Sequence, residues 1–136
     1  MKTITVNPIW AWSIIHGPKR IENRGWRTFH RGPLAIHAGR SRKTEAEDRA
    51  FLEALGVALP DDVPAGVILG TVDLTDCQPF AGPLRADPWA CGPWCWILEN
   101  PRPFITPIPA RGQQRLWTCR LPKGLSLTTS TKENPR

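Results

Sequence analysis

The chain has 136 residues, a length that suits one domain, and its 40% apolar and 22% charged residues are typical of a globular protein. No apolar run approaches the ~18 residues of a membrane-spanning helix, and the N-terminal segment before Pro8 is too short and polar for a signal peptide. From these features we expect neither a membrane-spanning nor a secreted protein, and we predict a cytoplasmic one.

The formal net charge is +6, and nearly all of the basic excess lies in one stretch. Between Gly17 and Lys43 there are eight basic residues and one acid, Glu22, whereas the remainder has ten basic and eleven acidic residues. A local basic surface attracts polyanions, and arginine, which dominates here, suits bidentate contact with phosphate. The alternative is a solvated face that aids solubility. We favour a functional patch and expect these side chains to converge on one surface.

The first elements follow from local signals. Residues 4–6 alternate as a short strand does, and Asn7 followed by Pro8 is a strong helix start. Residues 9–15 are apolar nearly all round, which predicts a buried helix that ends at Gly17.

Two strands and a second helix are predicted next. Residues 20–23 suit a strand, and residues 33–38 alternate in period two. Thr44 and Glu47 have the spacing of a capping box. The helix that follows carries one apolar stripe, which consists of Ala46, Ala50, Phe51, Ala54 and Leu55.

The second half is richer in proline. Residues 66–74 indicate a strand in which Gly70 marks a bend or a close approach, and residues 80–93 indicate a loop. Further extended segments are expected at 94–99, 104–108 and 116–121. Short strands with two inserted helices imply an α+β fold built on a small, mostly antiparallel barrel. Residues 124–136 read as a polar, flexible tail.

The chemistry-bearing motif is the run from Gly17 to Arg24, which reads GPKRIENR. The helix stop places Lys19 in a turn, and in the strand that follows Glu22 and Arg24 share one face. This can be a structural salt-bridge cluster, or a site where Glu22 orients Lys19 and Arg24 toward a ligand, or one where Lys19 acts as a base. We expect the three side chains to line one solvent-reachable cleft, with Trp26 or His37 at its edge.

Aromatic residues and histidine admit two interpretations each. Trp10, Trp12 and Trp96 fall in helix and strand patterns and are expected in the core. The loop residues Trp26, Trp89 and Trp94 can pack or can stack on a base. His37 can be a satisfied core histidine or an acid or base that points into the cleft.

The four cysteines are Cys77, Cys91, Cys95 and Cys119. Zinc sites usually show two close pairs, and only Cys91 and Cys95 are close in sequence. We therefore expect reduced thiols with no metal and no cofactor.

The order of these motifs resembles the ASCH (activating signal cointegrator homology) domain of the PUA-like superfamily. The resemblance runs from about residue 4 to 122 and rests on PIWAW at 8–12, GPKRIENRGW at 17–26, RGPLAIHA at 31–38, WILENPRPF at 96–104 and PIPARG at 107–112. It implies a PUA-like β-barrel with flanking helices, with the domain at 1–123, and a cleft beside the GxKxxExR turn. In acetylcytidine amidohydrolases of this family a threonine nucleophile follows the lysine by three residues, and this sequence has Glu22 there.

The resemblance implies RNA, single-stranded nucleic acid or a modified nucleotide as the partner. The expected binding residues are Lys19, Arg24, Trp26, Arg27, Arg31, His37 and Arg40. One alternative is a nucleic-acid-directed hydrolase, either a ribonuclease or an amidohydrolase, in which Lys19 and Glu22 transfer protons. A second alternative is a protein-interaction domain.

Overall fold

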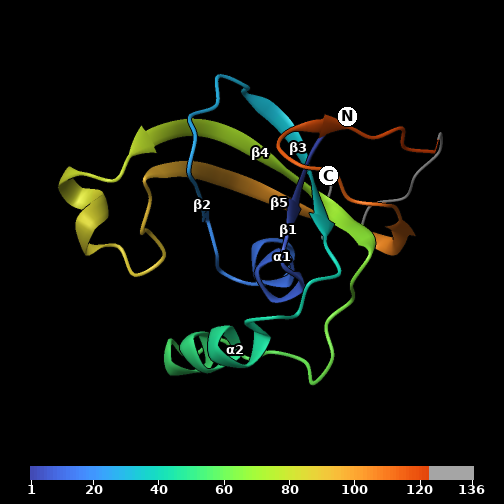
Figure 1. Cartoon of the computed structure of the whole chain (residues 1–136), viewed down its shortest axis with the longest axis horizontal. Helices are drawn as coiled ribbons and strands as arrows, with labels where there is room; N and C mark the ends of the chain where they lie inside the picture. Colours follow the sequence, from blue (N-terminus) through green and yellow to red (C-terminus); the bar gives the residue numbers. More distant parts are fainter. Residues whose placement is uncertain (123–136) are drawn as a thin grey trace, which may run out of the picture.

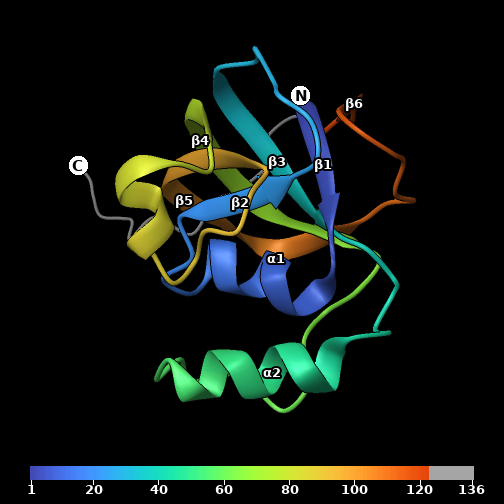
Figure 2. The same ribbon diagram turned by 60° about the vertical axis from the view of Figure 1, so that its left-hand side comes forward.

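A computed structural model describes residues 1–122, so the predicted tail at 124–136 lies outside the described residues. The element order is β1 (Lys2–Val6), α1 (Pro8–Ile15), β2 (Ile21–Arg24), β3 (Gly32–Ala38), α2 (Glu45–Ala54), β4 (Val67–Pro79), η1 (Gly82–Ala86), β5 (Trp94–Pro109) and β6 (Trp117–Thr118). The strands form one curved sheet, with α1 beneath it and α2 beyond α1 (Figures 1 and 2). The predicted α+β class is confirmed.

The sheet has six strands in the order β2-β5-β4-β3-β1-β6. All neighbouring pairs are antiparallel except β1 and β3, which run parallel. Within residues 1–122 the edge strands β2 and β6 do not pair with each other, so the sheet is open and the predicted barrel is not closed. The antiparallel character was predicted correctly, and the closure was not.

Helix α1 begins at Pro8 and buries most of its length, as predicted. Its buried side chains Ala11, Ile14 and Ile15 pack with strand residues such as Ile36 and Trp96 in the main core cluster. The burial of this apolar helix fixes the turn at Gly17, since the chain must leave the core there. Lys19 follows at the edge of that core.

The apolar stripe predicted for α2 does not form a core face. Leu52 is the buried residue of this helix, and it packs with Ile9, Val57 and Val63. Phe51 and Leu55 are exposed. The reason is that α2 lies against α1 and not against the sheet, so a narrow contact suffices to hold it (Figure 2). The Thr44 hydroxyl donates to Asp48 and does not cap the helix as a capping box would.

Strand β3 is buried on both faces, although its sequence alternates. Leu34 and Ile36 belong to the main core, while Ala35 packs with Ile68 and Phe104 in a second cluster on the other face. His37 is also buried. This follows from the central position of β3 between β4 and β1.

Strands β4 and β5 are longer than predicted and form a curved ribbon that ends in the loop containing η1 (Figure 1). The predicted close approach at Gly70 is present, because a Cβ atom there would lie 2.4 Å from the Arg102 carbonyl oxygen. Strand β6 is restricted to Trp117–Thr118. No helix within the described residues has the length and apolar character needed to cross a membrane.

Candidate functional site

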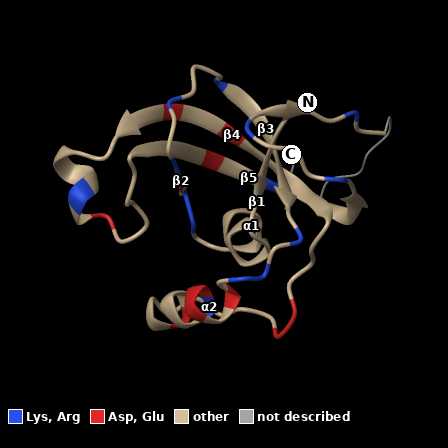
Figure 3. Cartoon of the chain, in the orientation of Figure 1, with Lys and Arg blue, Asp and Glu red and all other residues tan. Residues whose placement is uncertain are grey.

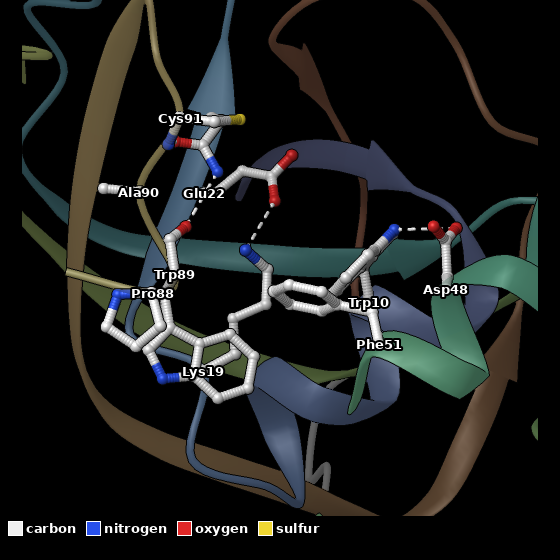
Figure 4. Close-up of a pocket in the computed structure, with 10 residues that line it drawn as sticks. Trp10, Lys19, Glu22, Asp48, Phe51, Pro88, Trp89, Ala90 and Cys91 are labelled. Carbon is white, nitrogen blue, oxygen red and sulfur yellow. Dashed lines mark hydrogen bonds and ion pairs between the residues drawn. The ribbon is translucent and has the colours of Figure 1, made fainter. Parts of the chain in front are cut away.

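A pocket of about 640 Å³ opens beside the motif turn, where α1, α2, β2 and the loop before β5 meet (Figure 4). Lys19 and Glu22 lie at its inner wall, and they are only 3% and 8% exposed. The aromatic side chains of Trp10, Phe51 and Trp89 also line it. We call this cavity the aromatic pocket.

The Lys19–Glu22 pair is the polar centre of the aromatic pocket. Lys19 Nζ lies 3.5 Å from Glu22 Oε1 and donates to the carbonyl oxygen of Ile21. The ammonium also lies 5.3 Å from the centroid of the Trp10 ring, within the range of a cation–π interaction. These contacts hold the Lys19 ammonium beside the Glu22 carboxylate. Separating the two groups would leave an unpaired buried charge, which is costly.

Arg24 contacts the carboxylate oxygen of Glu22 that does not face Lys19. Its Nε lies 3.1 Å from Glu22 Oε2, and its Nη2 donates to the carbonyl oxygen of Thr5 at 2.6 Å. The period-two spacing of an extended strand puts Glu22 and Arg24 on one face, as the sequence predicted. Arg24 does not line the aromatic pocket, so its visible role is to hold the Glu22 carboxylate.

Asn23 attaches the Trp89 loop to β2. Its Nδ2 donates to the Trp89 carbonyl oxygen at 3.0 Å, and its Oδ1 accepts from the backbone N–H groups of Cys91 and Gly92, both at 2.9 Å.

On the opposite wall of the aromatic pocket, Trp10 Nε1 donates to Asp48 Oδ2 at 3.0 Å, and the Trp10 ring packs edge-on to Phe51. The Trp10 indole is thus held through its own N–H group, and the Trp89 loop is held through its backbone.

The basic residues of the stretch 19–43 do not gather around the aromatic pocket. Its charged lining residues are Lys19, Glu22 and Asp48, so two carboxylates face one ammonium. Arg27 lies over Phe29 and near Trp94, and Arg31 pairs with Asp76 at 3.6 Å. Lys and Arg are spread over the fold (Figure 3). Apart from Lys19, none of the eight basic residues of this stretch lines the aromatic pocket, and their convergence on one surface stays a prediction.

Three further residues of the predicted binding set lie elsewhere. Trp26 packs edge-on against Trp96 with a centroid distance of 4.9 Å, and the Arg115 guanidinium lies 4.2 Å from its ring centroid. His37 and Arg40 line a second cavity, near the C-terminal ends of β1 and β3. The aromatic pocket therefore contains Lys19 and Glu22 from the predicted set, but not Trp26, His37, Arg27, Arg31 or Arg40.

Sequence reasoning missed several pocket residues. Trp10 was expected in the core, and no pattern pointed to Asn23, Asp48 or Phe51. The sequence placed Phe51 in the apolar stripe of the second helix, whereas its side chain is exposed and lines the aromatic pocket. Trp89 was predicted as a residue that can pack or can stack on a base, and it lines the aromatic pocket.

His37 is a satisfied histidine with both ring nitrogens engaged. Nε2 donates to the Ala110 carbonyl oxygen at 2.7 Å, so Nδ1 carries no proton and accepts from the Thr5 hydroxyl at 3.1 Å. Trp117 Nε1 in turn donates to that hydroxyl oxygen at 3.2 Å. This chain of bonds ties β3, β1, β6 and the end of β5 together, and it leaves His37 no free nitrogen for proton transfer.

Burial lowers the pKa of His37 below its ordinary value. The hydrogen bond to Ala110 acts in the opposite direction and raises this pKa, whereas the nearby Arg40 charge lowers it further. Since the unfolded chain then binds a proton more readily than the native one, stability is full above the ordinary histidine pKa of ~6.5 and is lost as pH falls below it. We expect the free energy of unfolding, measured by urea titration, to decrease between about pH 7.5 and 5.

The variant His37→Gln should flatten that pH dependence, whatever its stability at neutral pH. His16, whose pKa is also lowered by burial, supplies the comparison. His16→Gln should remove only its own share and keep the fall due to His37. An unchanged slope in His37→Gln would show that the buried imidazole is not the titrating group.

The cysteines do not form a metal site within residues 1–122. No group of three or more His, Cys, Asp or Glu side chains there is placed to hold an ion. Cys77 and Cys95 are buried, Cys91 is exposed at the rim of the aromatic pocket, and Cys119 is partly exposed. Burial raises the pKa of the Cys95 thiol, so this group stays protonated at neutral pH.

Comparison with known proteins identifies the family. Residues 4–121 match the sequence model of the ASCH domain. The chain is 31% identical over 125 residues to human Activating signal cointegrator 1 and 30% identical over 124 residues to the mouse protein. Each match covers 84% of this chain, which spans about 21% of the length of these relatives.

A solved structure supports the fold assignment. The crystal structure of a point mutant of the ZmASCH protein from Zymomonas mobilis is similar with a TM-score of 0.53 and 16% identity, covering 88% of this chain and 87% of that one. At this identity the likeness concerns the fold alone. Together with the family match over residues 4–121, these findings show that the chain belongs to the ASCH domain family.

Proposed function

We propose that the aromatic pocket binds one unstacked base of single-stranded RNA or of a modified nucleotide. The observation that carries this is the composition of the wall: Trp10, Phe51 and Trp89 surround a buried Lys19–Glu22 ion pair in a cavity of about 640 Å³. Small-molecule sites commonly occupy ~300–1,000 Å³ and combine apolar walls with a few fixed polar groups. A nucleobase offers a flat face to the aromatic rings and a polar edge to the ion pair.

The charge of the pocket favours a base over a phosphate. Glu22 and Asp48 outnumber Lys19 among its charged lining residues, so a phosphate dianion would meet net repulsion. The Glu22 carboxylate suits exocyclic amino groups and ring N–H donors, whereas the Lys19 ammonium suits carbonyl oxygens. Membership of the ASCH family supports an RNA ligand. Single-stranded RNA also fits the pocket walls, since it presents unstacked bases that aromatic side chains can hold.

The test measures binding of single nucleosides and of short single-stranded RNA by tryptophan fluorescence and calorimetry. Trp89→Ala should weaken binding by about 1–3 kcal/mol, the usual worth of one base–aromatic contact. Phe29→Ala is the matched control, since Phe29 is 78% exposed and lies outside the aromatic pocket. Equal affinities for wild type and Trp89→Ala would contradict the proposal, and no nucleoside binding at all would favour a protein-interaction domain.

A hydrolase is the second candidate because of one observation. Lys19 and Glu22 form a paired ammonium and carboxylate at the wall of a cavity that can admit a base. In this mechanism the pair would transfer protons at a nucleobase amide or a phosphodiester. Glu22→Gln keeps the shape of the side chain, so it should abolish product release while RNA binding falls far less. If the wild-type protein binds an RNA for hours and no cleaved or deacylated product forms, the hydrolase candidate is contradicted.

A further inference from the structure

The second cavity lies between the end of β3, the start of β4 and the segment after β5. Its volume is about 890 Å³, and it contains two residues of the predicted binding set, His37 and Arg40. Arg111, Gln113 and Gln114 also line it. We call this cavity the arginine pocket.

The arginine pocket is purely cationic. Arg40 and Arg111 are its charged residues, and no aspartate or glutamate lines it. Within residues 1–122 neither guanidinium lies within 4.0 Å of a carboxylate, whereas Arg24, Arg31, Arg42 and Arg102 each have such a partner. The positive charge of this cavity is therefore not neutralised by the described residues, in contrast to the aromatic pocket.

Glycines let the side chains of the arginine pocket lie close against the backbone. The hydrogen bonds of His37 to Thr5 and Ala110 fix one wall. Gly66 has φ +71°, and a Cβ atom there would lie 2.7 Å from Arg40 Cζ, so only glycine lets this guanidinium rest against the backbone. At Gly112 a Cβ atom would lie 2.8 Å from His37 Cε1.

We propose that the arginine pocket binds a phosphate group of a nucleic-acid chain. Two guanidinium groups can form bidentate hydrogen bonds to phosphate oxygens, and the amides of Gln113 and Gln114 add neutral donors. The backbone N–H groups of Gly39 and Gly66 are already bonded to Val6 and Ala38, so the side chains must supply the contacts. The assignment of this phosphate to a nucleic acid rests on the proposed function. A base in the aromatic pocket and a phosphate in the arginine pocket would both come from a nucleic-acid ligand.

The test follows backbone amide NMR signals during three titrations. Inorganic phosphate should shift the signals of Gly39, Gly66 and Gly112, whereas a nucleoside without phosphate should shift those of Trp89 and Ala90. A short RNA with or without a 5′-phosphate then separates the two sources of phosphate. Tighter binding of the phosphorylated RNA points to a terminal phosphate, and equal binding with shifts at these glycines points to an internal diester. Equal binding without those shifts contradicts the site.

The decisive variant is Arg40→Gln with Arg111→Gln. We expect RNA affinity to fall at least about tenfold, which corresponds to the loss of one charge-assisted contact. The slope of log affinity against log salt concentration should decrease in magnitude by about 1. The matched control is Arg85→Gln with Arg120→Gln, which removes the same charge from exposed arginines that line neither cavity. A similar loss in both double variants would mean that only net charge matters, and this would overturn the inference.

The two proposals fail in different ways. If phosphate shifts the glycine signals but no nucleoside shifts those of the Trp89 loop, the base-binding proposal fails and the phosphate site stands. If phosphate produces no saturable shift at the glycines while nucleosides still bind, the arginine pocket is not a phosphate site. If an acidic peptide shifts the glycine signals more strongly than any phosphate compound, the partner is a protein and the inference is also wrong.

Discussion

Replacing Glu22 by alanine should destabilise the fold by about 3–5 kcal/mol. The carboxylate is nearly buried and lies between the Lys19 ammonium at 3.5 Å and Arg24 Nε at 3.1 Å. Its removal leaves two poorly hydrated cations facing each other without a counter-charge. Urea unfolding at neutral pH gives the free energy directly, and the transition should move to much lower denaturant.

Two further variants decide whether charge is the cause. Adding Lys19→Met to Glu22→Ala should recover part of the stability, because one of the unpaired cations is then gone. Asp62→Ala removes a carboxylate that is 93% exposed and lies 3.9 Å from Arg42, and it should cost less than about 1 kcal/mol. If Glu22→Ala proved as mild as Asp62→Ala, water would have to reach the cluster, and the aromatic pocket would be more open than described.

Replacing Trp96 by alanine should cost a similar amount, about 3–5 kcal/mol. Trp96 is fully buried on β5, belongs to the main core, and supports Trp26 by edge-on packing. It is also the β5 partner of Glu22 in the ladder with β2, so the cavity left behind lies directly behind the motif strand. We expect a large loss of unfolding free energy and a weaker hold on β2.

Trp94 is the matched control for this experiment. It has the same side chain and lies two residues away on the same strand, but it is only partly buried and its ring lies near Arg27. Trp94→Ala should therefore lose clearly less stability than Trp96→Ala. Equal losses would show that the strand itself, and not the burial of the indole, determines the cost.

Local signals in the sequence were sufficient for the start and end of the first helix and for the shared face of Glu22 and Arg24. Pro8 fits the first turn of a helix because its missing N–H is not needed there, and Gly17 ends the buried run. Period-two geometry then requires that alternate residues of β2 lie together, and the ion pair confirms it. These features depend on neighbours within a few residues, so the chain determines them without reference to distant segments.

Long-range pairing decided the remainder. Period-two alternation in β3 suggested one buried face, but its place between β4 and β1 buries both, and His37 becomes a structural residue. The apolar stripe of α2 suggested a core contact, but α2 packs on α1 and leaves Phe51 at the aromatic pocket.

The division of the predicted site into two pockets also required the tertiary structure. The sequence was sufficient to identify an ASCH-type chain, because its motifs occur in the order of that family. It also placed Lys19, Glu22 and Arg24 together, because they lie in one short run of the chain. It placed Lys19 and Arg40 in one basic stretch, yet Lys19 lines the aromatic pocket and Arg40 the arginine pocket. Periodicity tells which face of an element a side chain occupies, but which other element covers that face depends on contacts between residues far apart in the chain. Asn23 holding the Trp89 loop, and Ala110 bonding to His37, are such contacts, and they shape the two cavities.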